Sequence, residues 1–505
     1  MSDVAYASIG EIHNLYREKR LSVRELVLTF LTRIAAIDKC EGGLNSVLEI
    51  NPDALYIADA YDAMLRAGAE LTPLFGIPVL LKDNVNTGDG MHTSAGSVAL
   101  AGNYAPRDAH IVKLLRDAGA VILGKANMTE FANYMSNDNM PSGYSSRGGQ
   151  VINPYNRDVT PSGSSSGSAV AAAAGLCTVS IGTETCGSII SPAGYNGIVG
   201  VKPTLGLVGR SGIVPIAHTL DTAGPMARSV RDAAILLGVI AGRDPGDPAT
   251  HSAPADDMQA SSRESFASDC EPRRYAGDPP IQNGAAYYTG CLDPDGLKGA
   301  RIGVYRWRER DGNFTPDDET RAAFDDLLRL LANAGAVLVD GLDIGEHNGI
   351  GDIMRYEFKA DMNRYLSALN GNTKMKTLGD IVAYNQANAA VALKYGQGIL
   401  ADAENNTSGN MTEPAYIAAL MERERAAAAL DGLFVENRIN VLLCEAFVSV
   451  APFAGFPTAT IPTGLRRDKR PADSYWVARR YGEAALLKIT YAAEQILNIR
   501  IRPDI

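Results

Sequence analysis

The most informative part of the sequence covers residues 161–203 and begins Pro161-Ser162-Gly163-Ser164-Ser165-Ser166-Gly167-Ser168. An alanine-rich segment over 169–175 follows, and then an apolar segment over 178–181. A second turn reads Gly182-Thr183-Glu184-Thr185-Cys186-Gly187-Ser188. Glycine and serine are common in flexible linkers, but alanine favours a packed helix and apolar β-branched residues favour a strand. The stretch therefore predicts two structured turns that flank one helix and one strand.

Strand-like and helix-like segments alternate on both sides of this stretch. Ser8 with Glu11, and Ser22 ahead of an apolar periodic segment, predict the starts of two helices within 8–38. The apolar segment over 75–81 predicts a strand that ends at Lys82. Further helices are expected over 52–67, 109–118, 229–241, 317–334, 350–369, 378–400, 414–436 and 483–497, further strands over 120–123, 301–305, 337–339 and 441–443, and a turn with a strand over 455–462. This alternation is typical of an α/β fold.

Composition narrows the class of protein. The chain has 505 residues, and 58 acidic against 47 basic side chains give it a formal net charge of −11, which disfavours nucleic-acid binding. The six cysteines form no C-x-x-C pair, so we expect reduced thiols and no zinc or redox motif. The N-terminus lacks the pattern of a signal peptide, and no apolar segment is long enough to span a bilayer. We therefore expect a cytoplasmic protein without a membrane partner.

Ser188 and Lys82 are the candidate reactive residues. Ser188 follows Gly187 in a turn after a strand, where successive backbone N–H groups can stabilise an oxyanion. A serine hydroxyl needs a base, yet none of the six histidines lies within a few residues of either turn. Lys82 ends a buried strand, and burial lowers the pKa of a lysine toward that of a neutral amine that accepts protons.

The chain resembles the amidase signature family of Ser-cisSer-Lys hydrolases. The resemblance covers most of the chain and rests on the following motifs: Gly76-Ile77-Pro78-Val79-Leu80-Leu81-Lys82-Asp83-Asn84, Thr93-Ser94-Ala95-Gly96-Ser97, Gly124-Lys125-Ala126-Asn127-Met128-Thr129-Glu130-Phe131-Ala132, both serine turns, Gly200-Val201-Lys202-Pro203-Thr204, Leu220-Asp221-Thr222-Ala223-Gly224-Pro225-Met226-Ala227-Arg228-Ser229 and Ala454-Gly455-Phe456-Pro457. It implies one large domain with a mixed central β-sheet covered on both faces by helices.

The resemblance also implies a role for each catalytic position. Ser188 would be the nucleophile, Ser164, 24 positions earlier, the bridging serine in a cis peptide, and Lys82 the base. The expected oxyanion donors are the amides of Thr185, Cys186, Gly187 and Ser188. The implied reaction is hydrolysis of a carboxamide to a carboxylic acid and ammonia through an acyl-enzyme.

The chain departs from the family pattern in the first serine turn, over 162–167, which is richer in glycine in many members, and at three further positions. Glu184 stands where Asp is frequent, Cys186 where Gly is frequent, and Ile190 where many members carry an Arg that can hold a substrate carboxylate. Within the family the chain is most similar to bacterial peptide amidases, which deamidate peptide C-termini. The supporting segments are 145–149, 182–185, 356–360 and 384–387, and the segment 444–453 is shorter than in many members.

Several alternatives remain at this stage. A general aliphatic or aryl amidase and a glutamine-amidotransferase A-type subunit belong to the same family. A non-catalytic binding protein on the same scaffold is a further possibility. Residues 163–167 also fit G-x-S-x-G, which would make Ser165 the nucleophile of an α/β-hydrolase esterase, but the segment before it is a poor strand with two prolines.

We expect four parts within one domain. These are N-terminal helices over 1–70, the signature core over 71–241, an irregular surface insertion over 242–299, and a part over 300–505 that completes the substrate pocket. The expected ligand is a small-molecule or peptide amide. No cluster has metal-ligand spacing, so neither a metal nor a cofactor is implied.

Overall fold

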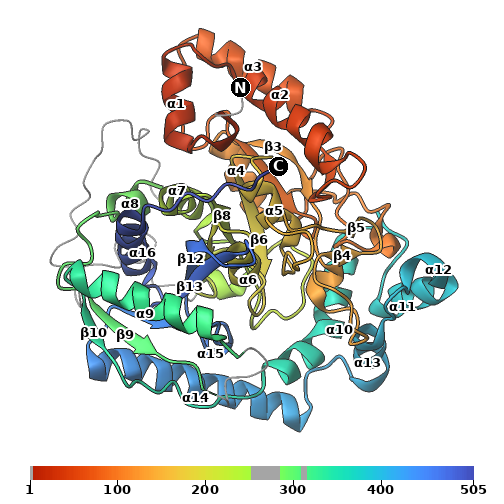
Figure 1. Cartoon of the computed structure of the whole chain (residues 1–505). Helices are drawn as coiled ribbons and strands as arrows, with labels where there is room; N and C mark the ends of the chain where they lie inside the picture. The colour runs from red at the N-terminus through yellow and green to blue at the C-terminus, as the bar shows by residue number, and fades with distance from the viewer. Residues whose placement is uncertain (1–3, 252–284, 309–314) are drawn as a thin grey trace.

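One mixed β-sheet of 11 strands forms the centre of the molecule. The computed structural model describes residues 4–251, 285–308 and 315–505, so much of the expected insertion over 242–299 lies outside the described residues (Figure 1). The strand order is β1-β3-β2-β6-β8-β7-β12-β13-β11-β9-β10. The strands are β1 Val47–Ile50, β2 Pro78–Lys82, β3 Val121–Ala126, β6 Val179–Glu184, β7 Val199–Lys202, β8 Thr222–Ala227, β9 Arg301–Tyr305, β10 Val337–Val339, β11 Val441–Cys444, β12 Thr458–Leu465 and β13 Pro471–Val477. A small separate hairpin pairs β4 Tyr144–Ser145 with β5 Gly149–Gln150.

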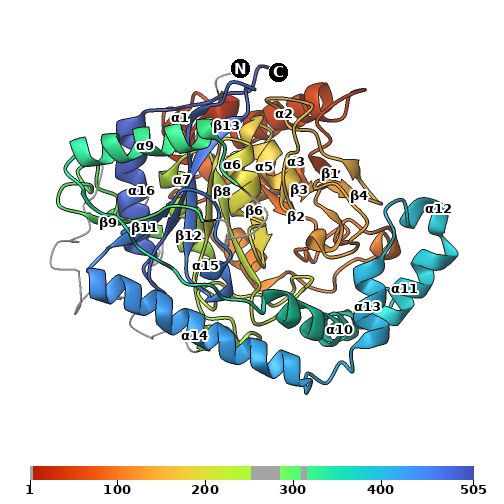
Figure 2. The same ribbon diagram turned by 60° about the horizontal axis from the view of Figure 1, so that its bottom comes forward.

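Helices cover the sheet. The α5–α6 pair and the α7–α16 pair lie on the two sides of the strands (Figure 2). The bounds are α1 Ile9–Arg17, α2 Val23–Arg33, α3 Ala54–Arg66, α4 His110–Asp117, α5 Ser166–Ala173, α6 Ile190–Tyr195, α7 Val230–Ile240, α8 Ala285–Gly290, α9 Asp318–Asn333, α10 Ile350–Ala368, α11 Leu378–Ala387, α12 Ala389–Ala392, α13 Gly398–Asn406, α14 Pro414–Asn437, α15 Val450–Phe453 and α16 Glu483–Leu497. The expected mixed sheet between helices is confirmed.

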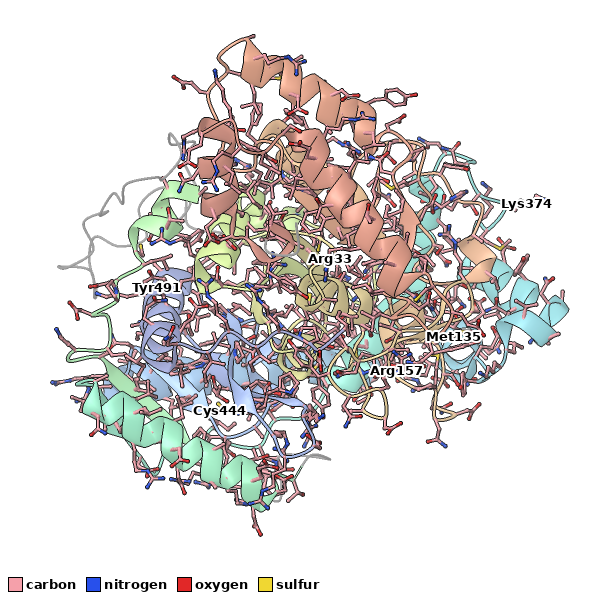
Figure 3. All side chains as sticks on the ribbon, turned by 45° about the horizontal axis from the view of Figure 1, so that its top comes forward. Arg33, Met135, Arg157, Lys374, Cys444 and Tyr491 are labelled. Carbon is pink, nitrogen blue, oxygen red and sulfur yellow. The ribbon has the colours of Figure 1, made fainter. Side chains whose placement is uncertain are left out.

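The N-terminal helices begin where the capping residues predict and pack against the core. Ser8 and Ser22 each form a capping box, with Glu11 and Glu25 respectively. Arg33, at the end of α2, donates to the carbonyls of Ala174 (2.7 Å) and Gly175 (2.9 Å) just beyond α5 (Figure 3). This contact ties α2 to the helix that starts in the first serine turn.

Two sequence predictions need correction. The segment 378–400 is not one helix but α11, α12 and the start of α13, because Asn388 and Leu393 each end a helix with non-helical backbone angles. The second is the insertion over 242–299, which is not irregular throughout, because its described end contains helix α8 with Ala285 and Tyr288 buried. The sequence analysis also did not predict strands β1, β7, β8 and β13 or helix α6. Strand β8 contains both Gly224 and Pro225, and residues of this kind are depleted in strands.

The pairing of β3, β2 and β6 positions the site. These three neighbours run parallel, so their carboxyl ends meet at one edge of the sheet. Lys82 is the last residue of β2, and Glu184 is the last residue of β6. The lysine and the second serine turn therefore leave the sheet side by side, although 101 residues separate Lys82 from Thr183.

Two findings bear on the class of protein. Over residues 4–251, 285–308 and 315–505, no helix is long and apolar enough to cross a membrane. Among the cysteines in these ranges, Cys40, Cys177 and Cys186 are free thiols.

Candidate active site

Lys82 lies fully buried at the centre of the site. Its Nζ is 2.8 Å from Ser164 Oγ, 2.9 Å from Thr183 Oγ1 and 3.1 Å from the Thr183 carbonyl oxygen. Thr183 Oγ1 also accepts a hydrogen bond from Asn84 Nδ2 at 2.9 Å. These contacts fix the amine against one serine.

The electrostatic setting favours a neutral amine near neutral pH. Burial lowers the pKa of Lys82 to about 7, against a smaller opposing effect of the nearby carboxylates of Asp221 and Glu184. A lysine with this pKa can accept a proton at the pH of a cell.

Ser164 is fully buried and follows a cis peptide bond between Gly163 and Ser164, as the family resemblance implies. The next residue links the two serine turns, because the amide of Ser165 donates to the carbonyl of Ser188 at 3.2 Å. Ser188 itself is half-buried. The hydroxyls of Ser164 and Ser188, both in the described part of the chain, form no hydrogen bond with each other. Lys82 thus contacts the side chain of Ser164 directly, whereas Ser188 is linked to the first serine turn by the backbone hydrogen bond to Ser165.

Glu184 shapes the turn over residues 185–188. Its Oε2 accepts from the amides of Ile189 (2.8 Å) and Ile190 (3.1 Å), which anchors the far side of the turn. Gly187 has φ +84°, a conformation that glycine adopts without a steric cost. Within the described chain the amides of residues 185–188 donate to no protein acceptor. Such free N–H groups can stabilise an oxyanion.

A small cavity adjoins this turn, with room for about one water-sized molecule. The loop over residues 216–221 forms one wall of it through Ile216 and Asp221. Asp221 accepts from Thr185 Oγ1 at 2.6 Å and from the amides of Ile216 and Ala217 at 2.8 and 3.0 Å. Burial raises the pKa of the Asp221 carboxyl to about 6. The sequence motifs contained Asp221 and Thr183, but nothing in their spacing assigned either residue to the site.

A segment with unusual backbone angles also lines the cavity. Phe131, Ala132 and Asn133 have φ of 46°, 55° and 68° in succession, and Ala132 lines the cavity. Non-glycine residues in this region cost free energy and tend to occur at functional sites. The amide of Phe131 donates to the carbonyl of Ala95 at 2.9 Å, which holds the segment in place.

The structure argues against two alternative nucleophiles. Burial raises the pKa of the Cys186 thiol to about 12, which suppresses the reactive thiolate. Ser165 is fully buried and donates to the carbonyl of Thr183 at 3.1 Å, and no strand precedes it over residues 151–165. The strand-turn-helix arrangement that an α/β-hydrolase requires is therefore missing there.

His218 faces two acidic residues of α10. Its Nδ1 lies 2.8 Å from Asp361 and 3.2 Å from Glu357. The three donor atoms are close enough together for a metal ion, but each of the four carboxylate oxygens already accepts a hydrogen bond. We therefore describe this group as an ion-pair cluster.

Comparisons with known proteins agree with this geometry. The Amidase family model matches residues 25–272. The crystal structure of native peptide amidase from Stenotrophomonas maltophilia superposes with a TM-score of 0.85 at 38% identity, over 98% of both chains. A probable amidase of Arabidopsis thaliana is 36% identical over 98% of this chain and 91% of its own length. A glutamyl-tRNA(Gln) amidotransferase component of Bdellovibrio bacteriovorus is 31% identical over 97% of both chains.

These matches span the whole fold and include the sheet edge that carries the buried lysine and both serine turns. The chain belongs to the Amidase family and is an amide-hydrolysing enzyme.

Proposed function

We propose that the enzyme deamidates peptides at a C-terminal carboxamide, releasing a carboxylic acid and ammonia, through Ser188, Ser164 and Lys82. The observation that carries the proposal is the 2.8 Å contact between Lys82 Nζ and Ser164 Oγ in a fully buried setting. It supports a route by which a neutral amine activates one hydroxyl through another.

In the proposed mechanism, Lys82 accepts the proton of Ser164 while Ser164 takes that of Ser188. Ser188 Oγ forms a bond to the amide carbon, and the amides of Thr185, Cys186, Gly187 and Ser188 stabilise the oxyanion. The proton held on Lys82 returns through Ser164 to the amide nitrogen, and ammonia leaves. Water then attacks the acyl-enzyme with the same relay as base and regenerates Ser188.

Two observations favour a peptide amide over other carboxamides. The Stenotrophomonas peptide amidase matches almost the whole chain, including the C-terminal part outside the shared motifs. Ile190, where many family members carry Arg, is buried and apolar, and its amide donates to Glu184. The side chain at this position therefore offers no cation to bind a free carboxylate of glutamine or of a dicarboxylic acid amide.

A panel of amides tests the substrate class. Purified enzyme would be incubated with an N-acetylated peptide amide, the same peptide as free acid, propionamide, benzamide, and glutamine with and without ATP. Mass spectrometry would monitor conversion of each amide to its acid. We expect the peptide amide to have the highest kcat/KM of all the compounds in the panel. Faster turnover of glutamine or of the simple amides would contradict the peptide assignment while leaving the family intact.

A fluorophosphonate probe tests the nucleophile. We expect one covalent adduct, mapped to Ser188 by peptide sequencing, and neither labelling nor turnover in Ser188→Ala. Ser191→Ala is the matched control, because this half-buried hydroxyl lies three positions further along, and it should label normally. An adduct on Ser165 would instead support the α/β-hydrolase esterase alternative.

A further inference from the structure

The loop over residues 216–221 is held from two sides. On the inside, Asp221 accepts from Thr185 Oγ1 at 2.6 Å, at the start of the turn that leads to Ser188. On the outside, His218 and Thr219 contact two acidic residues of α10, the helix that passes below the sheet together with α14 (Figure 2). The loop therefore connects α10 to the proposed oxyanion turn.

The contact between the 216–221 loop and α10 is electrostatic. Glu357 and Asp361 have almost no solvent exposure, at 0% and 3%, whereas the His218 side chain is 41% exposed. His218 donates to Asp361 through its backbone amide, at 2.8 Å, and its Nδ1 lies within 3.2 Å of a carboxylate oxygen of each acid. Two buried carboxylates thus face an imidazole that bulk protons can reach.

Other charged and titratable groups surround this cluster. Arg364 of α10 donates to Asp361 at 3.1 Å, and the hydroxyl of Tyr416 from α14 donates to Glu357 at 2.8 Å. Arg210 donates to the carbonyls of His218 and Asp221, but its guanidinium is neutralised by Asp247 at 2.6 Å. Burial lowers the pKa of His218, but the hydrogen bond to Asp361 and the charges of Asp361 and Glu357 together outweigh burial and Arg210, so the pKa is raised above its usual 6.5.

We propose that His218 is a positioning residue, whose imidazolium clamps the 216–221 loop onto α10 and thereby holds Asp221 and Thr185 in the geometry that the oxyanion turn needs. The inference rests on the proposed function for its link to catalysis. When His218 loses its proton it keeps at most one neutral hydrogen bond to Asp361, and the two carboxylates face each other with less compensation. A charged hydrogen bond is worth more than a neutral one, so the clamp weakens as the pH rises.

The test compares three forms of the full-length enzyme over pH 6–9. His218→Arg keeps a positive charge at every pH, and His218→Asn keeps a donor near the Nδ1 position without charge. Titration of Lys82 is common to all three forms and cancels when kcat/KM is expressed as a ratio to wild type. We expect the Arg/wild-type ratio to rise about fivefold with increasing pH, and the Asn/wild-type ratio to be lowest in acid and to approach one in alkali.

A second readout separates failure of this inference from failure of the proposed function. Since the pKa of His218 is raised by folding, its contribution to stability is complete below about pH 6.5 and is lost as the pH rises through the folded value. The unfolding free energy of His218→Arg relative to wild type should therefore increase with pH, whatever the substrate. His92→Asn, which removes another histidine–carboxylate pair at Glu49, is the control and should leave the shape of the rate profile unchanged.

Two results would overturn the inference. The first is a ratio of kcat/KM between His218→Arg and wild type that does not change with pH. The second is a pH-dependent stability difference without any matching change in rate, which would make the clamp structural only.

Discussion

Burial of the Lys82 amine predicts that stability depends on pH in a way that a single substitution removes. The folded enzyme holds Lys82 with a pKa of about 7, whereas the unfolded chain keeps it near its ordinary 10.5. Between these values the unfolded state binds one more proton than the folded state, so unfolding free energy rises with pH. In Lys82→Met, where this proton is absent, that contribution disappears.

The magnitude follows from the two pKa values. Over the interval from pH 7 to pH 9, the wild-type unfolding free energy should rise by about 2 kcal/mol relative to that of Lys82→Met, at about 1.4 kcal/mol per pH unit once Lys82 is fully neutral. Because the folded state lowers the pKa of this basic group, burial of Lys82 reduces the unfolding free energy. This reduction is complete below pH 7 and vanishes above pH 10.5. All other titrating groups, including the buried Lys125 and Lys202, are common to both proteins and cancel in the difference.

Urea unfolding followed by circular dichroism at pH 7, 8 and 9 measures this difference. Lys125→Met is a matched control for a second buried lysine outside the site, whose burial lowers its pKa only to about 8, so its difference from wild type should develop at higher pH. A difference between wild type and Lys82→Met that stays constant from pH 7 to 9 would refute the claim that Lys82 is neutral in the folded enzyme.

Further predictions concern the rate. Below neutrality, kcat/KM should fall about tenfold for each pH unit, with a midpoint near pH 7, because only the neutral amine of Lys82 is a base; a midpoint above pH 9 would contradict this. Lys82→Ala should lower kcat by orders of magnitude at every pH without loss of substrate binding, measured as KM against kcat. Thr183→Val, which removes the hydroxyl 2.9 Å from Lys82, should lower kcat about tenfold to a hundredfold while Thr183→Ser retains most of it; equal activity of the two variants would argue against this contact. Glu184→Leu should lower kcat more than Glu184→Gln, because only the side-chain amide of the glutamine can still accept hydrogen bonds from the backbone amides of Ile189 and Ile190. Titration of the nucleophile with a fluorophosphonate separates lost activity from lost folding.

The sequence predicts those parts of the fold that local patterns encode. Ser8 and Ser22 cap their helices as expected, since a capping box needs only neighbours three residues apart. Strand β8, by contrast, carries Gly224 and Pro225 and is held by its long-range pairing with β6 and β7. No local pattern reports such pairing, and tertiary context overrides propensity there.

The same distinction applies to the site. Burial alone does not single out Lys82, because Lys125 and Lys202 are also fully buried and donate to backbone carbonyls. Family motifs picked out Lys82 and Ser164, and the structure brings their side chains into contact. Thr183, Asp221 and the His218 cluster depend on where separate elements meet in space, so the linear sequence contained the residues without indicating their partners.

The unequal exposure of the site residues has a chemical consequence. Ser188 is half-buried, while Lys82 and Ser164 have no solvent-accessible surface. An amine with a pKa of about 7 would ordinarily be an early target of acylating and aldehyde reagents, but the buried Lys82 amine is out of their reach while the Ser188 side chain is partly exposed. Electrophilic inhibitors of this enzyme should therefore be directed at the Ser188 hydroxyl, and amine-selective labels should leave Lys82 of the folded enzyme unmodified.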